Sequence, residues 1–360
     1  MDDLLAQKLA PLRARIDEID AEVFALLTER ARTALAVGEV KQHVSGPVLR
    51  PEREAQVIRR LQDMNAGPLP ASAIAAIWGE IMSACRALEE PAKVAYLGPQ
   101  GTYSEVAALA HFGHAIETVP CVNFDEVFRA VEAGRADFGM VALENSNEGA
   151  VNRVLDLLLT SSAKVLGERS VPVHHCLMTR SGTLDGVQRV RAHPQALAQC
   201  QAWLSEHRPD LIRESASSNA EAARMAAEDP TVAAIASEQA AGLWNLCIVA
   251  PHIQDDPHNR TRFLAIGHID TAPSGKDKTS LILAVPNEAG AVYEMLKPLA
   301  DNGVSMTRFE SRPARTGQWE YYFYVDIEGH QQDPQVATAL AVLKSRAAFF
   351  KVLGSYPVAP

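Results

Sequence analysis

The chain has 360 residues, of which 47% are apolar and 22% charged, and it carries a formal net charge of −10. This length is too great for one compact core and predicts two or three domains. The acidic balance argues against nucleic acid as the main partner, so any anionic ligand must be attracted by local groups of cations.

Cysteine usage and the N-terminal sequence indicate the cellular setting. The five cysteines are widely spaced and never form a CxxC pair, which predicts reduced thiols, a cytoplasmic protein and no metal site. An amphipathic pattern rather than an apolar segment follows Met1, so we expect neither a signal peptide nor a membrane span.

The first ninety or so residues show helical patterns alone. A helix is predicted over residues 4–43, and breaks at 45–47 and 67–70 separate it from two more. At 1.5 Å per residue the first helix is a rod of about 60 Å, far longer than so small a domain is wide. We therefore expect an all-helical, intertwined dimer, with a long monomeric hairpin as the alternative.

Cations recur along these helices. Arg30 and Lys41 are eleven residues apart in the sequence, which places them on one face of the first helix. Arg13 lies about 25 Å from Arg30 along the same rod. It would reach a ligand shared with Arg30 only from a partner subunit, although arginines on a long helix are most often solvated surface.

From Lys93 onward short buried strands alternate with helices, which predicts an α/β domain ending near Gly267. Strands are expected at residues 94–97, 138–142 and 187–190, and helices at 104–111, 124–133 and 219–227. Polar groups at strand ends and at glycine turns converge on a ligand in such domains. Three motifs of this kind are Glu144-Asn145-Ser146, residues 98–104 with Thr102 and Ser104, and Asn259-Arg260-Thr261-Arg262-Phe263.

After a linker at residues 270–276, the last segment has the order strand (279–285), helix (291–302), strand (305–311), strand (319–327) and helix (334–347). This order is typical of a ferredoxin-like fold. Gly290 precedes the first of these helices, where free N–H groups bind a carboxylate.

In their order and separation, the three polar motifs resemble those of prephenate dehydratase. The whole chain resembles a bifunctional chorismate mutase and prephenate dehydratase with a C-terminal ACT regulatory module. The resemblance implies an all-α intertwined mutase domain at 1–91, a two-lobed α/β dehydratase domain at 92–269 with the plan of solute-binding proteins, and a ferredoxin-like ACT domain at 277–357. It also implies the substrates chorismate and prephenate, L-phenylalanine as effector, no cofactor, and a homodimer, with a tetramer left open.

For the mutase, the resemblance implies that Arg13, Arg30 and Lys41 hold carboxylates, with Lys41 also near the ether oxygen, and that Glu54 binds the ring hydroxyl. The remaining predicted site residues are Arg50, Arg53, Ser83, Cys85 and Glu89. Many members have aspartate in place of Arg50, and some have serine and glutamine in place of Cys85 and Glu89. A carboxyl donates a hydrogen bond only when protonated, so we expect mutase activity to fall as Glu89 loses its proton.

For the dehydratase, the resemblance assigns the catalytic step to Thr261. A hydroxyl is a weak acid, so Thr261 relays or orients a proton rather than donating it unaided. The predicted substrate contacts are Thr102, Ser104, Glu144, Asn145, Ser146, Gln199, Glu238, Thr261, Arg262 and Phe263. Ala192 stands where serine is common in the family. Without the family match, a threonine at the start of a strand is the simpler interpretation.

For the ACT module, the resemblance implies a phenylalanine site at an interface between two modules. Its predicted residues are Asn287, Gly290, Ala291 and Val292 in one motif and Glu310, Ser311, Arg312 and Pro313 in the other. Taken singly, a glycine turn before a helix is more often a capping device.

Two other functions compete with this interpretation. A mutase fused to a prephenate dehydrogenase needs a dinucleotide site, but the sequence contains no Gly-x-Gly. An amino-acid sensor would keep its ligand affinity in a Thr261→Ala variant, because a sensor has no use for a proton relay.

Overall fold

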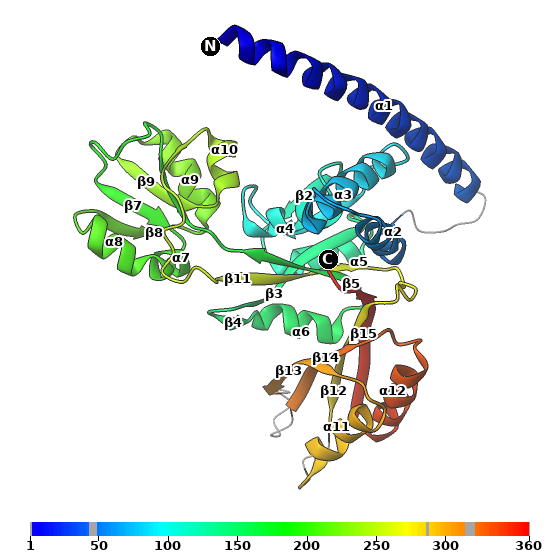
Figure 1. The fold of residues 1–360 in the computed structure, drawn as a ribbon. Coiled ribbons are helices and arrows are strands. Elements are labelled where there is room, and N and C mark those ends of the chain that lie inside the picture. The colour runs from blue at the N-terminus through cyan, green and yellow to red at the C-terminus, as the bar shows by residue number, and fades with distance from the viewer. Residues whose placement is uncertain (1, 43–48, 286–287, 314–320, 360) are drawn as a thin grey trace.

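The computed structural model describes residues 2–42, 49–285, 288–313 and 321–359, and the side chains of residues 2–4, 41 and 42 are outside that description. A helical domain, a two-lobed α/β domain and a C-terminal α+β domain follow one another along the chain (Figure 1). This arrangement confirms the predicted fold class of the three domains, while the intertwined dimer stays a prediction. None of the helices in the described ranges is both long and apolar enough to cross a lipid bilayer.

The helical domain has one long helix and two short ones. Its elements are α1 (Asp2–Gln42), α2 (Pro51–Asp63) and α3 (Ala71–Ala87). The N-terminal half of α1 extends away from the rest of the molecule (Figure 1). Its apolar side chains face solvent, with Leu12 62%, Ile16 56% and Phe24 72% exposed. Burying such a stripe is strongly favourable, and the described part of this chain does not cover it.

The first lobe is a mixed sheet flanked by helices. Its elements are β1 (Lys93–Leu97), α4 (Tyr103–Phe112), β2 (Glu117–Cys121), α5 (Phe124–Glu132), β3 (Phe138–Asn145), β4 (Gly149–Ala150), α6 (Asn152–Thr160), β5 (Lys164–Pro172) and β11 (Arg260–Gly267). The strand order is β2-β1-β3-β11-β5, and β4 pairs with β3. Because β11 runs antiparallel to β3 with Thr261 opposite Asn145, two of the three polar motifs meet at one point.

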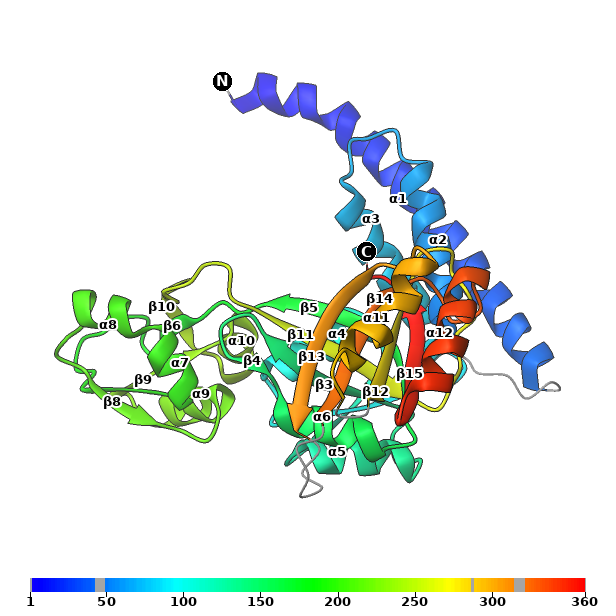
Figure 2. The same cartoon turned by 90° about the horizontal axis from the view of Figure 1, so that it is seen from below.

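The second lobe carries its own sheet, with strand order β10-β6-β9-β7-β8. Its elements are β6 (Cys176–Thr179), β7 (Arg189–Ala192), α7 (Pro194–Gln199), α8 (Gln201–His207), β8 (Ile212–Ser215), α9 (Asn219–Glu228), β9 (Val232–Ala236), α10 (Glu238–Trp244) and β10 (Cys247–Ala250). Residues 173–175 and 251–259 join it to the first lobe, and it lies at one end of the molecule in both views (Figures 1 and 2). The strand predicted at 187–190 forms two residues later, at β7.

The C-terminal domain has one strand more than the sequence analysis predicted. Its elements are β12 (Asp277–Ala284), α11 (Ala291–Asp301), β13 (Met306–Pro313), β14 (Tyr321–Glu328), α12 (Pro334–Arg346) and β15 (Phe349–Pro357), in the sheet order β13-β14-β12-β15. The missed strand is β15. Leu353 and Tyr356 on β15 belong to the same hydrophobic cluster as Leu143 and Leu155 of the first lobe. The C-terminal domain and the first lobe therefore share a core rather than being joined by a linker alone.

Candidate functional sites

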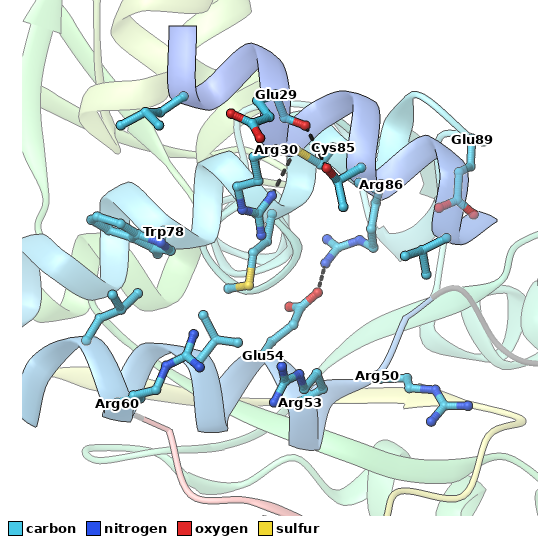
Figure 3. A pocket seen from close by; sticks show the side chains of 17 residues that line it. Glu29, Arg30, Arg50, Arg53, Glu54, Arg60, Trp78, Cys85, Arg86 and Glu89 are labelled. Carbon is cyan, nitrogen blue, oxygen red and sulfur yellow. Dashed lines mark hydrogen bonds and ion pairs between the residues drawn. The ribbon is translucent and has the colours of Figure 1, made fainter. Parts of the chain in front are cut away.

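A cavity of about 750 Å³ lies among the three helices of the helical domain (Figure 3). Its charged lining consists of five arginines and three glutamates: Arg30, Arg50, Arg53, Arg60 and Arg86, and Glu29, Glu54 and Glu89. Such a surplus of guanidinium groups in a protein of net charge −10 suits a small anion with more than one negative group.

Two of the arginines in this cavity are held by hydrogen bonds to other residues of its lining. Arg30 Nη1 donates to Cys85 Sγ at 2.9 Å, and Arg86 Nη1 donates to the Glu54 carboxylate. Burial raises the pKa of Glu54, and the guanidinium of Arg86 is the largest influence that lowers it again. Whether Glu54 is ionised in this cavity therefore depends on Arg86.

Glu89 lies at the rim of the cavity, against α1 (Figure 3). A Cβ atom on Gly38 would overlap the Glu89 carboxyl group. The absence of a side chain at Gly38 therefore makes room for this carboxyl beside the helix.

Three residues predicted for this site lie elsewhere or are not described. Ser83 is 1% exposed and its Oγ accepts from the Ala115 N–H of the two-lobed domain at 3.3 Å, so it faces away from the cavity. Arg13 is exposed on α1 and is not part of the lining. Lys41 belongs to the last turn of α1, but its side chain is outside the described residues.

Arg86, Arg60 and Trp78 line the cavity although the sequence analysis did not select them. A signal for Arg86 and Trp78 was present. Residues 78, 82, 85 and 86 of α3, with residue 89 just beyond its end, recur at helical spacing and form one face. The side chain of Cys85, which was selected, lies on the same face.

A chain of amide hydrogen bonds crosses the junction of the two lobes. Asn145 Nδ2 donates to Thr261 Oγ1 and to Asn259 Oδ1, both at 2.9 Å. Asn259 Nδ2 donates to Gln199 Oε1 at 2.9 Å, and His175 Nε2 lies 2.9 Å from the same oxygen. The chain thus runs from the end of β3 through both crossover segments to α7 of the second lobe.

His175 takes part in this chain as a neutral imidazole, because burial lowers its pKa. With Gln199 Oε1 as the acceptor, Nε2 carries the proton. His175 was not selected from the sequence, in which a histidine between two apolar runs gives no distinctive signal.

The glycine loop before α4 faces the second lobe. Ser237 Oγ donates to the Gly101 carbonyl at 3.1 Å, and Thr102 Oγ1 donates to the Leu97 carbonyl at 2.9 Å. Ser104 is buried at 7% exposure, whereas Glu238 is exposed and pairs with His252 at 3.5 Å. The loop is therefore a second contact between the lobes.

Three other predicted contacts point away from the interlobe chain. Phe263 is 1% exposed in the core of the first lobe. Arg262 pairs with Glu168 at 2.6 Å, with Asp326 of the C-terminal domain at 2.7 Å and with Glu144 at 3.2 Å. Glu144 and Arg262 therefore connect the strands that carry Asn145 and Thr261 to the C-terminal domain.

A second cavity, of about 500 Å³, lies between the first lobe and the C-terminal domain. Ser146 and Glu310, predicted for two different sites, both line it. Arg312 of the same β13 segment is 7% exposed and donates to Asn152 and, at 2.7 Å, to Asp156 of α6. Ser311 and Pro313 are exposed on this edge strand.

The start of α11 forms a small cavity of about 200 Å³, lined by Gly290 and Ala291. Val292 is 39% exposed, and Asn287 lies outside the described residues. No residue of the 310–313 motif lines this cavity. Within the part of the chain that the structure describes, the two predicted halves of an effector site are thus not brought together.

Comparisons with known proteins cover all three domains. Residues 12–90 match the family model for chorismate mutase type II, residues 94–271 that for prephenate dehydratase, and residues 279–344 that for the ACT domain. A relative from Neisseria gonorrhoeae described as a bifunctional chorismate mutase/prephenate dehydratase is 50% identical over 362 residues, which cover 100% of this chain and 99% of the relative.

Two solved structures resemble the last two domains. One is a prephenate dehydratase in complex with L-Phe from Arthrobacter aurescens, with 34% identity and a TM-score of 0.68, covering 74% of this chain and 90% of that one. The other is described as GqqA, a novel type of quorum quenching acylase, with 34% identity and a TM-score of 0.69, covering 74% of this chain and 98% of that one.

Proposed function

Because the chain belongs to the family of bifunctional chorismate mutase/prephenate dehydratases, we propose that its helical cavity is the mutase site and its interlobe hydrogen-bond chain the core of the dehydratase site. The protein converts chorismate to prephenate and prephenate to phenylpyruvate in L-phenylalanine biosynthesis. The match over the whole chain to relatives with both activities carries this conclusion. The direct test supplies purified protein with chorismate and follows prephenate and phenylpyruvate separately, with and without L-phenylalanine.

The mutase step is a concerted rearrangement that needs no nucleophile and no base. A catalyst can contribute a compact substrate conformation and cations that match the charge developing on the ether oxygen. The arginines of the cavity, with Arg30 and Arg53 among them, supply that charge for a substrate with two carboxylates. We assign the ring hydroxyl to Glu54 and the ether oxygen to Glu89 and Lys41.

A Glu89→Gln variant should keep its mutase activity at high pH, where the wild type loses it. The glutamine amide donates a hydrogen bond at any pH, whereas a carboxyl donates only while protonated. Initial rates from chorismate between about pH 5 and pH 9 measure both profiles. Glu90→Gln, at an exposed residue outside the cavity lining, serves as the control. An equally steep decline in Glu89→Gln would remove Glu89 from this role.

The exposed apolar stripe of α1 leads us to propose a homodimer in which two copies of α1 cover each other. Arg13 lies on the projecting half of α1, from which it would enter the cavity of the partner subunit. The cysteines Cys85, Cys121, Cys176, Cys200 and Cys247 are free. Free thiols are consistent with the cytoplasmic location that we also propose.

In the dehydratase step, prephenate loses carbon dioxide and hydroxide as its ring becomes aromatic. The barrier lies in the poor leaving group, so a proton must be directed at the hydroxyl while other groups hold the carboxylate. We propose that Thr261 directs this proton and that Asn145 orients Thr261. Glu144, Arg262 and Phe263 then hold the strands that carry Asn145 and Thr261 in place and do not contact the substrate.

We further propose that L-phenylalanine binds to the C-terminal domains and inhibits the dehydratase. The neighbouring solved structure with L-Phe supports this proposal. The motifs at 288–292 and 310–313 are separate within one chain, so a second copy of the domain would supply the other half of the site. Binding of L-phenylalanine must then change the contact between the C-terminal domain and the first lobe.

Arg308→Gln should weaken this inhibition and leave the uninhibited dehydratase rate near that of the wild type. Arg308 Nε donates to Glu144 at 2.8 Å across the domain boundary, next to Asn145, so its loss weakens the coupling between the domains. We expect the L-phenylalanine concentration that gives half inhibition to rise about tenfold, because a typical coupling free energy between two sites corresponds to a change of about this size. Lys297→Gln, which removes an ion pair within α11, is the matched control. Unchanged inhibition in Arg308→Gln would exclude this contact from the coupling.

A further inference from the structure

Arg86 lies where two faces of α3 meet. One face, with Met82 and Cys85, lines the mutase cavity (Figure 3). The other face, with Glu80 and Ser83, contacts the two-lobed domain. The Arg86 side chain is only 13% exposed, so its guanidinium has few partners other than those that the protein provides.

The two terminal nitrogens of Arg86 are divided between the two domains. Nη1 donates to the Glu54 carboxylate in the cavity, and Nη2 donates to the Phe112 carbonyl at 2.7 Å. Phe112 is the last residue of α4, where helix carbonyls lack partners within the helix and carry a partial negative charge. A planar guanidinium held at both nitrogens has little freedom to turn.

The residues around the contact between Arg86 and the Phe112 carbonyl are tightly packed. Gly113, which follows Phe112, has φ 80°, and a Cβ atom there would overlap the Ser83 side chain. The His114 N–H donates to Glu80 Oε2 at 3.1 Å, and His114 Nδ1 lies 2.7 Å from Glu80 Oε1. The end of α4 is thus held against α3, with the Phe112 carbonyl directed at Arg86.

Glu54 needs this arrangement because its surroundings are otherwise unfavourable for a carboxylate. Burial raises its pKa, with a further contribution from Glu52 on its own helix, and Arg86 from α3 and Arg30 from α1 lower it. Glu29 of α1 and Glu89 beyond the end of α3 line the same cavity, as do Arg50, Arg53 and Arg60. Among these groups in the described part of the chain, Arg86 donates a hydrogen bond to the Glu54 carboxylate.

We propose that Arg86 is a positioning residue of the mutase: it holds Glu54 ionised and directed into the cavity, and the dehydratase domain in turn holds Arg86 through the Phe112 carbonyl. This inference rests on the proposed assignment of the helical cavity to chorismate. It means that the mutase site of this chain is completed by the domain that follows it. Helix α4 then connects the two sites. Its last residue contacts Arg86 of the mutase cavity, and its first residue follows the glycine loop at the junction of the two lobes.

The first experiment measures kcat/KM of the mutase against pH in Arg86→Leu, Arg86→Lys and the wild type. An ionised Glu54 accepts a stronger hydrogen bond from the ring hydroxyl than a protonated one does, so activity rises with pH as Glu54 loses its proton. Without a neighbouring cation the ionised form is less stable, and the rise moves to higher pH. For each pH unit by which the Arg86→Leu profile moves, kcat/KM at a fixed pH below the rise should be about tenfold lower than in the wild type. The Arg86→Lys variant should restore most of this loss.

A purely structural role for Arg86 predicts a different result. Arg86→Leu would then lower kcat/KM by the same factor at every pH, and that outcome would overturn the inference. The effect must also depend on Glu54. In a Glu54→Gln background, Arg86→Leu should no longer move the profile, because the carboxylate that Arg86 contacts is no longer present.

The second experiment tests the role of the dehydratase domain in the full chain. Gly113→Ala forces the end of α4 away from Ser83 and should move the pH profile in the same direction as Arg86→Leu. Gly186→Ala is the matched control, since Gly186 has φ 77° and a Cβ atom there meets nothing within 4 Å. Circular dichroism and turnover of added prephenate report whether each variant is folded.

The outcomes separate this inference from the proposed function. A folded Gly113→Ala variant with the wild-type profile would show that Arg86 does not depend on the dehydratase domain. If Gly113→Ala does not fold, the pH profiles of the Arg86 variants alone test the inference. A wild-type protein that does not turn over chorismate would instead contradict the assignment of the cavity.

Discussion

Thr261→Val should lower the kcat of the dehydratase about 10²–10³-fold while the mutase activity of the same protein stays at the wild-type level. Valine has nearly the volume of threonine, so the change removes the hydroxyl and little else. The Asn145 amide donates to Thr261 Oγ1, so the hydroxyl acts as an acceptor there and its own proton remains for the leaving group of the substrate. Turnover of added prephenate measures the effect.

Two further variants test the mechanism behind this loss. Thr261→Ser keeps a hydroxyl and should retain activity within about tenfold of the wild type, since one donor is preserved. Asn145→Ala should lower kcat as well, and the double variant with Thr261→Val should be little worse than either single one, because the two residues act as a unit. A wild-type kcat in Thr261→Val would leave Thr261 as an ordinary residue at the start of β11.

Arg13→Ala and Arg30→Ala should each lower mutase activity at least about 10²-fold, and coexpression of the two should restore about a quarter of the wild-type rate. Each cavity takes Arg30 from one chain and Arg13 from its partner in the proposed dimer. About half of the dimers formed from equal amounts are mixed, and each mixed dimer has one intact site. The rate from chorismate tests this arrangement, and mixed dimers isolated through two different affinity tags should show about half of the wild-type rate.

The control for this experiment is Arg15→Ala. Arg15 is exposed on α1 two residues from Arg13 and pairs with Glu18 at 2.8 Å, so its loss changes the charge of the helix but not the cavity. If mixed dimers stay inactive, the mutase site is built within one chain and the intertwined arrangement is wrong.

Local patterns in the sequence were sufficient for most of the architecture. Helical spacing of apolar residues predicted α1 over 4–43, and it forms at Asp2–Gln42. The change from helical spacing to short apolar runs at Lys93 predicted the α/β domain, in which β1 and α4 lie within a residue or two of the expected positions. These patterns succeed because they follow from the period of each element and need no knowledge of its partners.

The strand β15 shows where such reasoning stopped. Its residues 349–353 contain aromatic and β-branched side chains, but the predicted order ended with the preceding helix. Most of these side chains are half-buried, because β15 completes its own sheet and also packs on β5 of the first lobe. A strand that is buried between two domains does not show the plain alternation of a strand with one solvent face.

The sequence by itself determined the three domains, the polar strand end at Asn145, the threonine at the start of β11 and the cations that recur along the long helix. Only the tertiary structure decided which way the neighbouring side chains point. It directs Ser83 toward the dehydratase domain, pairs Arg86 with Glu54 across 32 residues, and pairs Glu144 with Arg308 across 164. Periodicity specifies that one face of an element is buried, but the partner of that face is set by packing between segments distant in sequence.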